Sequence, residues 1–172
     1  MKTLYILRHA KAGPEGREGD AERPLMKRGR KAAAAIGEYL AGLAPAPTLV
    51  LCSTSLRTRE TLDEILPALD REPQQLFEDA LYLAGASRLL DRVQRLPEQA
   101  GSVLLIGHNP GLHQLAASLA SEAGGLAESF PTAALAVLRV AGHWSALRPH
   151  EATLIDFKTP KLLSRDPDFE SD

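Results

Sequence analysis

Histidine and arginine side chains occur together at three separate places in this 172-residue chain. Arg8 and His9 follow a short apolar run, Arg57 follows a Ser-Thr-Ser segment, and His108 follows another apolar run. The planar guanidinium of arginine suits phosphate oxygens and stays charged at any working pH, and a neutral imidazole can attack phosphorus. If folding brings these side chains together, they form a site for a phosphate dianion that contains a candidate nucleophile.

The segments that precede these residues are predicted to be buried strands, because they are short, apolar and bounded by polar residues. They span residues 3–7, 48–52 and 102–106. Helix-forming composition or helical spacing of apolar residues predicts helices over 25–43, 56–69, 87–96 and 112–123. The mixed segment 71–79 predicts a loop with a short strand, and two late strands are predicted over 134–140 and 152–157.

The alternation of strands and helices predicts an α/β fold, a three-layer sandwich with a mostly parallel central sheet and helices on both faces. In such folds a ligand binds beyond the carboxyl ends of the central strands. The three polar strand ends are therefore expected to meet over one edge of the sheet. We expect one domain over 1–163 and a polar C-terminal tail over 164–172.

Composition narrows the class of protein. Twenty Lys and Arg residues against twenty-two Asp and Glu give a net charge of −2, which argues against a nucleic-acid partner. The single cysteine, Cys52, allows no intrachain disulfide. No stretch reaches the ~20 apolar residues of a membrane helix, and the first residues do not resemble a signal peptide. We expect a soluble cytoplasmic protein without a membrane partner.

Two other readings of these residues are weaker. His108 and His113 are five residues apart with Pro110 between them, which is not the i,i+4 pair of a zinc helix, so neither a metal nor another cofactor is expected. Cys52 precedes Arg57 by too few residues for the phosphate loop of a cysteine-dependent phosphatase, so it is expected to be a buried small hydrophobe. The glycines of the 11–24 loop suggest a flexible lid.

Three motifs, in this order, resemble those of the histidine phosphatase superfamily. They are Leu7-Arg8-His9-Ala10, Ser53-Thr54-Ser55-Leu56-Arg57-Thr58 and Gly107-His108-Asn109-Pro110. Ala10 departs from the glycine that is usual in the superfamily. The absence of large insertions, and a further set of residues, resemble the SixA-type phosphohistidine phosphatases: Asp20, Arg23-Pro24-Leu25, Gly29 and Thr159-Pro160-Lys161-Leu162. The resemblance covers residues 3 to 163.

The resemblance implies roles for particular residues. His9 is the nucleophile that becomes phosphorylated, and Arg8, Arg57 and His108 hold the phosphoryl oxygens. Two further residues, Arg23 at the pocket mouth and Asn109, are expected to bind substrate. Superfamily members usually protonate the leaving group with an acidic residue, for which the candidates here are Glu78 and Asp79.

The sequence therefore predicts a metal-independent phosphatase that works through a phosphohistidine intermediate on His9. The expected substrate is phosphohistidine on a protein, such as a phosphotransfer domain, because imidazole is a good leaving group whose protonated form has a pKa of ~6.5. One alternative is a phosphomonoesterase or mutase acting on a small phosphorylated metabolite. The other is a non-catalytic phosphate-binding module, which the intact histidines and arginines disfavour.

Overall fold

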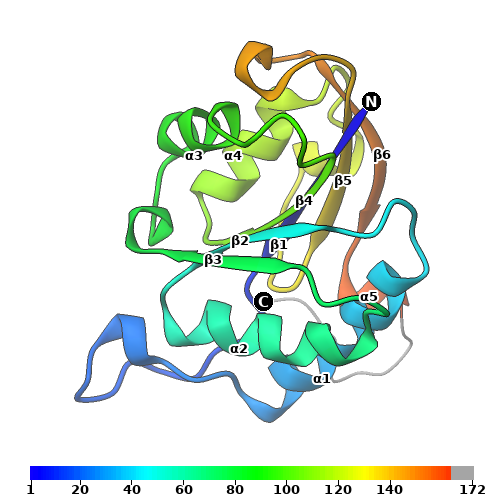
Figure 1. Cartoon of the computed structure of the whole chain (residues 1–172). Coiled ribbons are helices and arrows are strands. Elements are labelled where there is room, and N and C mark those ends of the chain that lie inside the picture. Colours follow the sequence, from blue (N-terminus) through cyan, green and yellow to red (C-terminus); the bar gives the residue numbers. More distant parts are fainter. Residues whose placement is uncertain (164–172) are drawn as a thin grey trace.

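A six-stranded sheet forms the centre of the computed structural model, which describes residues 1–163 (Figure 1). The strand order is β3-β2-β4-β1-β5-β6. The strands are β1 (Lys2–Arg8), β2 (Leu49–Ser53), β3 (Gln74–Glu78), β4 (Ser102–Gly107), β5 (Leu135–Val140) and β6 (Ala152–Lys158). The predicted tail 164–172 lies outside the described residues.

Four of these strands are parallel and two are not. β3, β2, β4 and β1 run parallel, whereas β5 pairs antiparallel with β1, and β6 pairs antiparallel with β5. The register places Arg8 of β1 opposite Gly107 of β4, and Cys52 of β2 opposite Ile106. The carboxyl ends of these three strands are therefore level, so the residues that follow them begin at the same edge of the sheet.

Helices cover both faces of the sheet. Figure 1 shows α1, α2 and α5 on one side and α3 and α4 on the other. The α-helices are α1 (Lys27–Ala41), α2 (Leu56–Ile65), α3 (Ala86–Gln94), α4 (Gly111–Leu119) and α5 (Pro160–Leu163). Short 3-10 turns are η1 (Asp20–Glu22), η2 (Leu66–Ala68), η3 (Asp79–Leu81), η4 (Gly124–Ala127) and η5 (Trp144–Ala146). The predicted α/β class with a mostly parallel sheet is confirmed.

Two apolar cores hold the layers together, because successive side chains of a strand point to opposite faces. Tyr5 and Leu7 of β1 pack with α1 and α2, whereas Leu4 and Ile6 of the same strand pack with α3 and α4. β2 and β4 are buried along their whole length, as expected for parallel strands covered on both faces. The strand ends are thus anchored from both sides.

Several element ends differ from the sequence-based predictions. The helix predicted from residue 25 begins at Lys27, because Leu25 instead bridges to Ala12. The helix predicted to residue 69 changes to a 3-10 turn after Ile65, where Pro67 removes a backbone donor. The helix predicted to residue 123 ends at Leu119. None of the helices within 1–163 is both long enough and apolar enough to span a membrane.

Candidate active site

A cavity of about 420 Å³ opens at the carboxyl edge of the parallel strands. It is lined by the end of β1, the loop that follows it, the start of α2, residue 83 after η3, and the segment after β4. The lining residues are Arg8, His9, Lys11, Ala12, Asp20, Arg23, Arg57, Leu83, His108, Asn109 and Thr132. Six of the eight predicted site residues are among them, and Glu78 and Asp79 are not.

His9 is buried at the base of this cavity, with 7% of its surface exposed. Its Nδ1 lies 2.8 Å from the carbonyl oxygen of Ala10. Because a carbonyl only accepts hydrogen bonds, Nδ1 carries the proton and donates it, which leaves the lone pair on Nε2. Burial, together with the charges of Arg8 and Arg57, lowers the pKa of His9 to about 3. The imidazole is therefore neutral near pH 7, as a nucleophile must be.

The backbone beside His9 is fixed by a side chain of α2. The amide of Ala10 donates to Thr61 Oγ1 at 2.9 Å, and the Thr61 hydroxyl donates to the carbonyl of Arg57 at 2.7 Å. Thr61 therefore joins the end of β1 to the first turn of α2. Nothing in the sequence pattern marks Thr61 for this position.

His108 has the opposite tautomer. Its Nδ1 accepts from the Arg57 guanidinium at 3.3 Å, and its Nε2 lies 2.7 Å from Ser53 Oγ, to which it donates. Burial and the nearby Arg57 charge lower the pKa of His108 to about 4. The ring centroids of His9 and His108 are 5.4 Å apart. Two neutral imidazoles thus lie side by side at the ends of β1 and β4.

Arg57 reaches the cavity from the first turn of α2, where Ser55 caps the helix by accepting from the amide of Thr58. Only 3% of Arg57 is exposed. Its guanidinium donates to the carbonyl of Asp20 at 2.8 Å and to the Asp20 carboxylate at 3.0 Å. Its Nε is buried and makes no hydrogen bond.

Arg8 and Asn109 share one backbone acceptor. The carbonyl of Phe130 accepts from Arg8 Nη1 at 3.3 Å and from Asn109 Nδ2 at 2.7 Å. This shared contact ties the ends of β1 and β4 to the segment before β5. Asn109 Oδ1 is buried without a hydrogen-bond partner.

Asp20 and Tyr82 are two further residues of the site that the sequence did not identify as such. The Asp20 carboxylate accepts from Tyr82, Arg23 and Arg57, and these bonds hold its pKa well below the ordinary range. Tyr82 also packs edge-on against His108, with 5.3 Å between ring centroids. The spacing of Asp20 and Arg23 suggested a family resemblance, whereas no pattern marked Tyr82.

Arg23 lies in the loop that precedes α1 and contacts the far side of that loop. Its Nε donates to the carbonyl of Gly13 at 2.7 Å, and its Nη1 donates to Asp20 at 3.1 Å. Both contacts lie within the 11–24 loop, and Asp20 joins this loop to Arg57 and Tyr82. Whether this loop acts as a lid stays a prediction.

The cavity is strongly cationic although the chain as a whole is not. Its lining includes four permanently basic side chains, Arg8, Lys11, Arg23 and Arg57, against the single carboxylate of Asp20. The net charge of the whole chain is −2. Such a concentration of positive charge attracts a dianion and holds it with charge-assisted hydrogen bonds. Within residues 1–163 no three His, Cys, Asp or Glu side chains form a group that could hold a metal ion.

Glu78 and Asp79, the predicted candidates for a general acid, are engaged elsewhere. Glu78 accepts two hydrogen bonds from Arg92, at 2.7 and 3.0 Å, and this pairing lowers its pKa. Asp79 accepts from Thr54 at 2.6 Å. These contacts give no support to either residue as a proton donor in the cavity.

Cys52 is confirmed as a buried residue of β2. It is fully buried among apolar side chains, and burial raises the pKa of its thiol to about 12. A thiol of this kind is protonated near pH 7 and is a poor nucleophile.

Comparison with known proteins places this geometry in context. Residues 4–80 match the model of the histidine phosphatase superfamily, branch 1. An uncharacterized protein of Mycobacterium tuberculosis is 35% identical over 162 residues, which cover 90% of this chain and all of that protein.

Solved structures of similar proteins share the fold over nearly their whole length. A SixA structure from Nakamurella multipartitia, a candidate phosphohistidine phosphatase, has 32% identity and a TM-score of 0.78, covering 92% of this chain and 96% of that one. The protein histidine phosphatase SixA complexed with tungstate has 25% identity and a TM-score of 0.80, covering 94% and 99%.

Proposed function

This chain belongs to the histidine phosphatase superfamily, in its SixA-type branch, and is a phosphatase; on that premise we propose that it removes the phosphoryl group from phosphohistidine on a protein. The observation that carries the proposal is the neutral His9, whose Nε2 lone pair lies in a cavity lined by Arg8, Arg57 and His108. The tungstate complex of a similar protein supports it, because tungstate is a tetrahedral oxyanion like phosphate.

In the first step, His9 Nε2 attacks phosphorus in line with the leaving nitrogen of the substrate. The new P–N bond forms on His9 as the P–N bond of the substrate breaks, and the leaving imidazole takes a proton from solvent. Charge on the equatorial oxygens is neutralised by Arg8 and Arg57.

In the second step, water attacks the phosphohistidine on His9. The P–N bond breaks, inorganic phosphate leaves, and the electron pair returns to Nε2. Because Nδ1 stays bonded to the carbonyl of Ala10 at 2.8 Å, the ring is held in one orientation through both steps.

The residues that line the cavity favour a substrate whose leaving group departs without help from a strong acid. Asp20 is the one carboxylate among the residues that line it, and its lowered pKa makes it a poor acid. An alkoxide leaving group requires protonation as it departs, whereas imidazole, whose protonated form has a pKa of ~6.5, does not depend on a strong acid. We therefore place phosphohistidine ahead of sugar phosphates as the substrate.

A substrate panel tests this proposal. A phosphohistidine peptide, free phosphohistidine and a sugar phosphate are each incubated with wild type and with His9→Ala, with and without a chelator. We expect turnover of both phosphohistidine substrates at a kcat/KM at least tenfold above that of the sugar phosphate, no effect of the chelator, and no activity in His9→Ala. Preference for the sugar phosphate, or full activity of His9→Ala, contradicts the proposal.

A further inference from the structure

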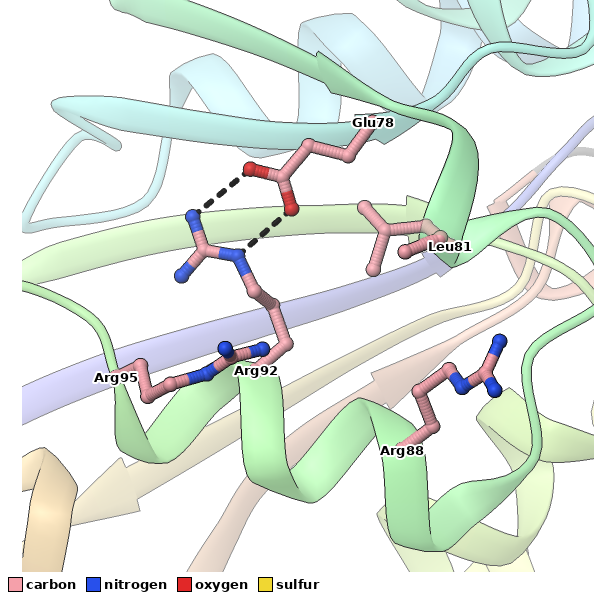
Figure 2. A pocket seen from close by; sticks show the side chains of 6 residues that line it. Glu78, Leu81, Arg88, Arg92 and Arg95 are labelled. Atoms are coloured by element: carbon pink, nitrogen blue, oxygen red, sulfur yellow. Dashed lines mark hydrogen bonds and ion pairs between the residues drawn. The ribbon is translucent and has the colours of Figure 1, made fainter.

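A second hollow, of about 350 Å³, lies outside the catalytic cavity between η3 and α3. Figure 2 shows it from close by, with Arg88 and Arg92 extending from α3, Arg95 just after the end of that helix, and Glu78 at the end of β3. The lining residues are Glu78, Ala80, Leu81, Arg88, Arg92 and Arg95. The proposed chemistry uses none of these side chains.

The hollow carries a net positive charge. Arg88 and Arg92 are four residues apart and so share one face of α3, and Arg95 follows directly after the helix ends at Gln94. Arg92 is paired with Glu78, as the dashed lines in Figure 2 show, and Glu78 is the only carboxylate among the lining residues. The exposed Arg88 and Arg95 leave this surface cationic on a chain whose net charge is −2.

The hollow adjoins the catalytic cavity. Leu81, at the end of η3, lines the hollow, and Leu83, two residues later, lines the cavity that contains His9. Two residues span at most about 7 Å of chain. The edge of the hollow is therefore within reach of a macromolecule that presents a phosphoryl group to His9.

An exposed apolar side chain lies where the chain passes from the hollow to the catalytic cavity. Leu83 is 55% exposed and has a φ of 51°, a left-handed conformation that a leucine rarely adopts. Arginine is enriched in protein–protein interfaces, and burial of an exposed apolar side chain such as Leu83 against a partner is favourable. A small anion would bind to the arginines alone and gain nothing from Leu83.

We propose that Leu83, Arg88 and Arg95 form a docking surface for an acidic protein, namely the phosphorylated protein whose phosphohistidine enters the cavity of His9. This inference rests on the proposed function. Charge complementarity identifies the partner's chemistry, because Asp and Glu side chains around the phosphohistidine would lie against Arg88 and Arg95. The docking surface would select among phosphoproteins without contacting the reacting atoms.

The test uses the double charge reversal Arg88→Glu/Arg95→Glu, which leaves the ion pair of Arg92 with Glu78 in place. The matched control is Arg71→Glu/Arg139→Glu, which changes the net charge equally. Both control residues are exposed, and they lie at the opposite end of the sheet, Arg71 before β3 and Arg139 opposite Thr3 of β1. The substrates are a phosphohistidine peptide flanked by Asp and Glu, the same peptide flanked by Gln, and free phosphohistidine.

For the acidic peptide we expect the kcat/KM of Arg88→Glu/Arg95→Glu to fall about tenfold, through KM, with a weaker dependence on salt than in wild type. Turnover of free phosphohistidine stays within about twofold, and the control variant resembles wild type. Equal losses in both double variants, an equal loss on free phosphohistidine, or wild-type turnover of the acidic peptide would overturn the docking surface.

Two further outcomes separate the hypotheses. If wild type hydrolyses all phosphohistidine substrates but treats acidic and neutral peptides alike, the docking surface is wrong and the proposed function stands. If wild type hydrolyses none of them, the proposed function fails. A second inorganic phosphate bound in calorimetry, and lost in Arg88→Glu/Arg95→Glu without an effect on the peptides, would identify a small-anion site and also contradict docking.

Discussion

At the scale of single residues, the two histidines of the cavity are set in opposite tautomers by their backbone and side-chain partners. The carbonyl of Ala10 fixes the proton on His9 Nδ1, and the Arg57 guanidinium fixes the proton on His108 Nε2. His9 thus has a lone pair on Nε2 that can attack phosphorus. Both ring nitrogens of His108 are instead engaged, by Arg57 and Ser53. Both imidazoles are neutral, because burial and adjacent positive charge disfavour a further cation.

The first prediction concerns the pH dependence of these histidines. In ¹⁵N NMR spectra of the imidazoles, we expect His9 as the Nδ1–H tautomer and His108 as the Nε2–H tautomer at pH 6. Neither should show a protonation midpoint above pH 5, because burial lowers the pKa of His9 to about 3 and that of His108 to about 4. A midpoint near the ordinary value of ~6.5 for either ring contradicts this assignment.

The same lowered pKa values predict that the protein becomes less stable as the pH is lowered. Below pH ~6.5 the unfolded chain protonates these histidines while the folded chain does not, so the free energy of unfolding falls as pH is lowered toward 4. Each histidine contributes a slope of up to about 1.4 kcal/mol per pH unit. Urea unfolding at pH 6.5, 5.5 and 4.5 should show that the free energy of unfolding depends less steeply on pH in His9→Gln than in wild type. Equal slopes in the two proteins would contradict a lowered pKa of His9.

A second prediction concerns Asp20. Its carboxylate bonds to the same guanidinium of Arg57 that the proposed reaction uses for phosphate. Asp20→Asn removes a negative charge next to the bound anion, so inhibition by inorganic phosphate should tighten about three- to tenfold at low salt. The control is Glu22→Gln, an exposed carboxylate in the same 3-10 turn. Weaker inhibition in Asp20→Asn would instead mean that Asp20 chiefly positions Arg57.

At the scale of elements, the sequence predicts the position of a residue wherever that position follows from a regular strand or helix pattern. The apolar runs before His9 and His108 predict buried strands, and parallel strands bring their carboxyl ends to one edge. Asp20 and Tyr82 could not be found in this way, because their positions depend on the backbone paths of irregular segments. The same limit applies to Glu78, whose pairing with Arg92 is a contact between β3 and α3.

Close backbone contacts, which no periodicity reveals, explain why positions 29 and 111 are glycines. A Cβ on Gly29 of α1 would lie 2.2 Å from the carbonyl oxygen of Lys11, and one on Gly111 of α4 would lie 1.9 Å from that of Ala84. α1 therefore packs directly on the loop after His9, and α4 on the segment after Leu83. Only a residue without a side chain allows these approaches.

The third prediction follows from the second of these contacts. Gly111→Ala forces α4 away from residue 84, and we expect a loss of about 1–3 kcal/mol in the free energy of unfolding, measured with urea. kcat should fall as well, because α4 begins three residues after His108. Gly101→Ala is the control, since no atom lies within 4 Å of its added Cβ. Equal stabilities of the two variants would contradict the packing described here.

At the scale of the whole molecule, charge is distributed unevenly over one end of the sheet. The net charge of −2 argues against a general basic surface but does not reveal two neighbouring cationic depressions, one lined by Leu81 and the other by Leu83. One is suited to the phosphoryl group and the other to the protein that carries it. We also infer that residues 1–163 fold as one domain, because β1 from the N-terminal end lies between β4 and β5 in the sheet.

The most direct test of the account is to trap the phosphorylated enzyme. Wild type is mixed rapidly with a phosphohistidine peptide that it hydrolyses, quenched in base, digested and analysed by mass spectrometry. The account predicts one phosphoryl group on His9, labile in acid, formed at least as fast as steady-state turnover, and absent from His9→Ala. A phosphoryl group on another residue, or undiminished turnover by His9→Ala, would contradict it.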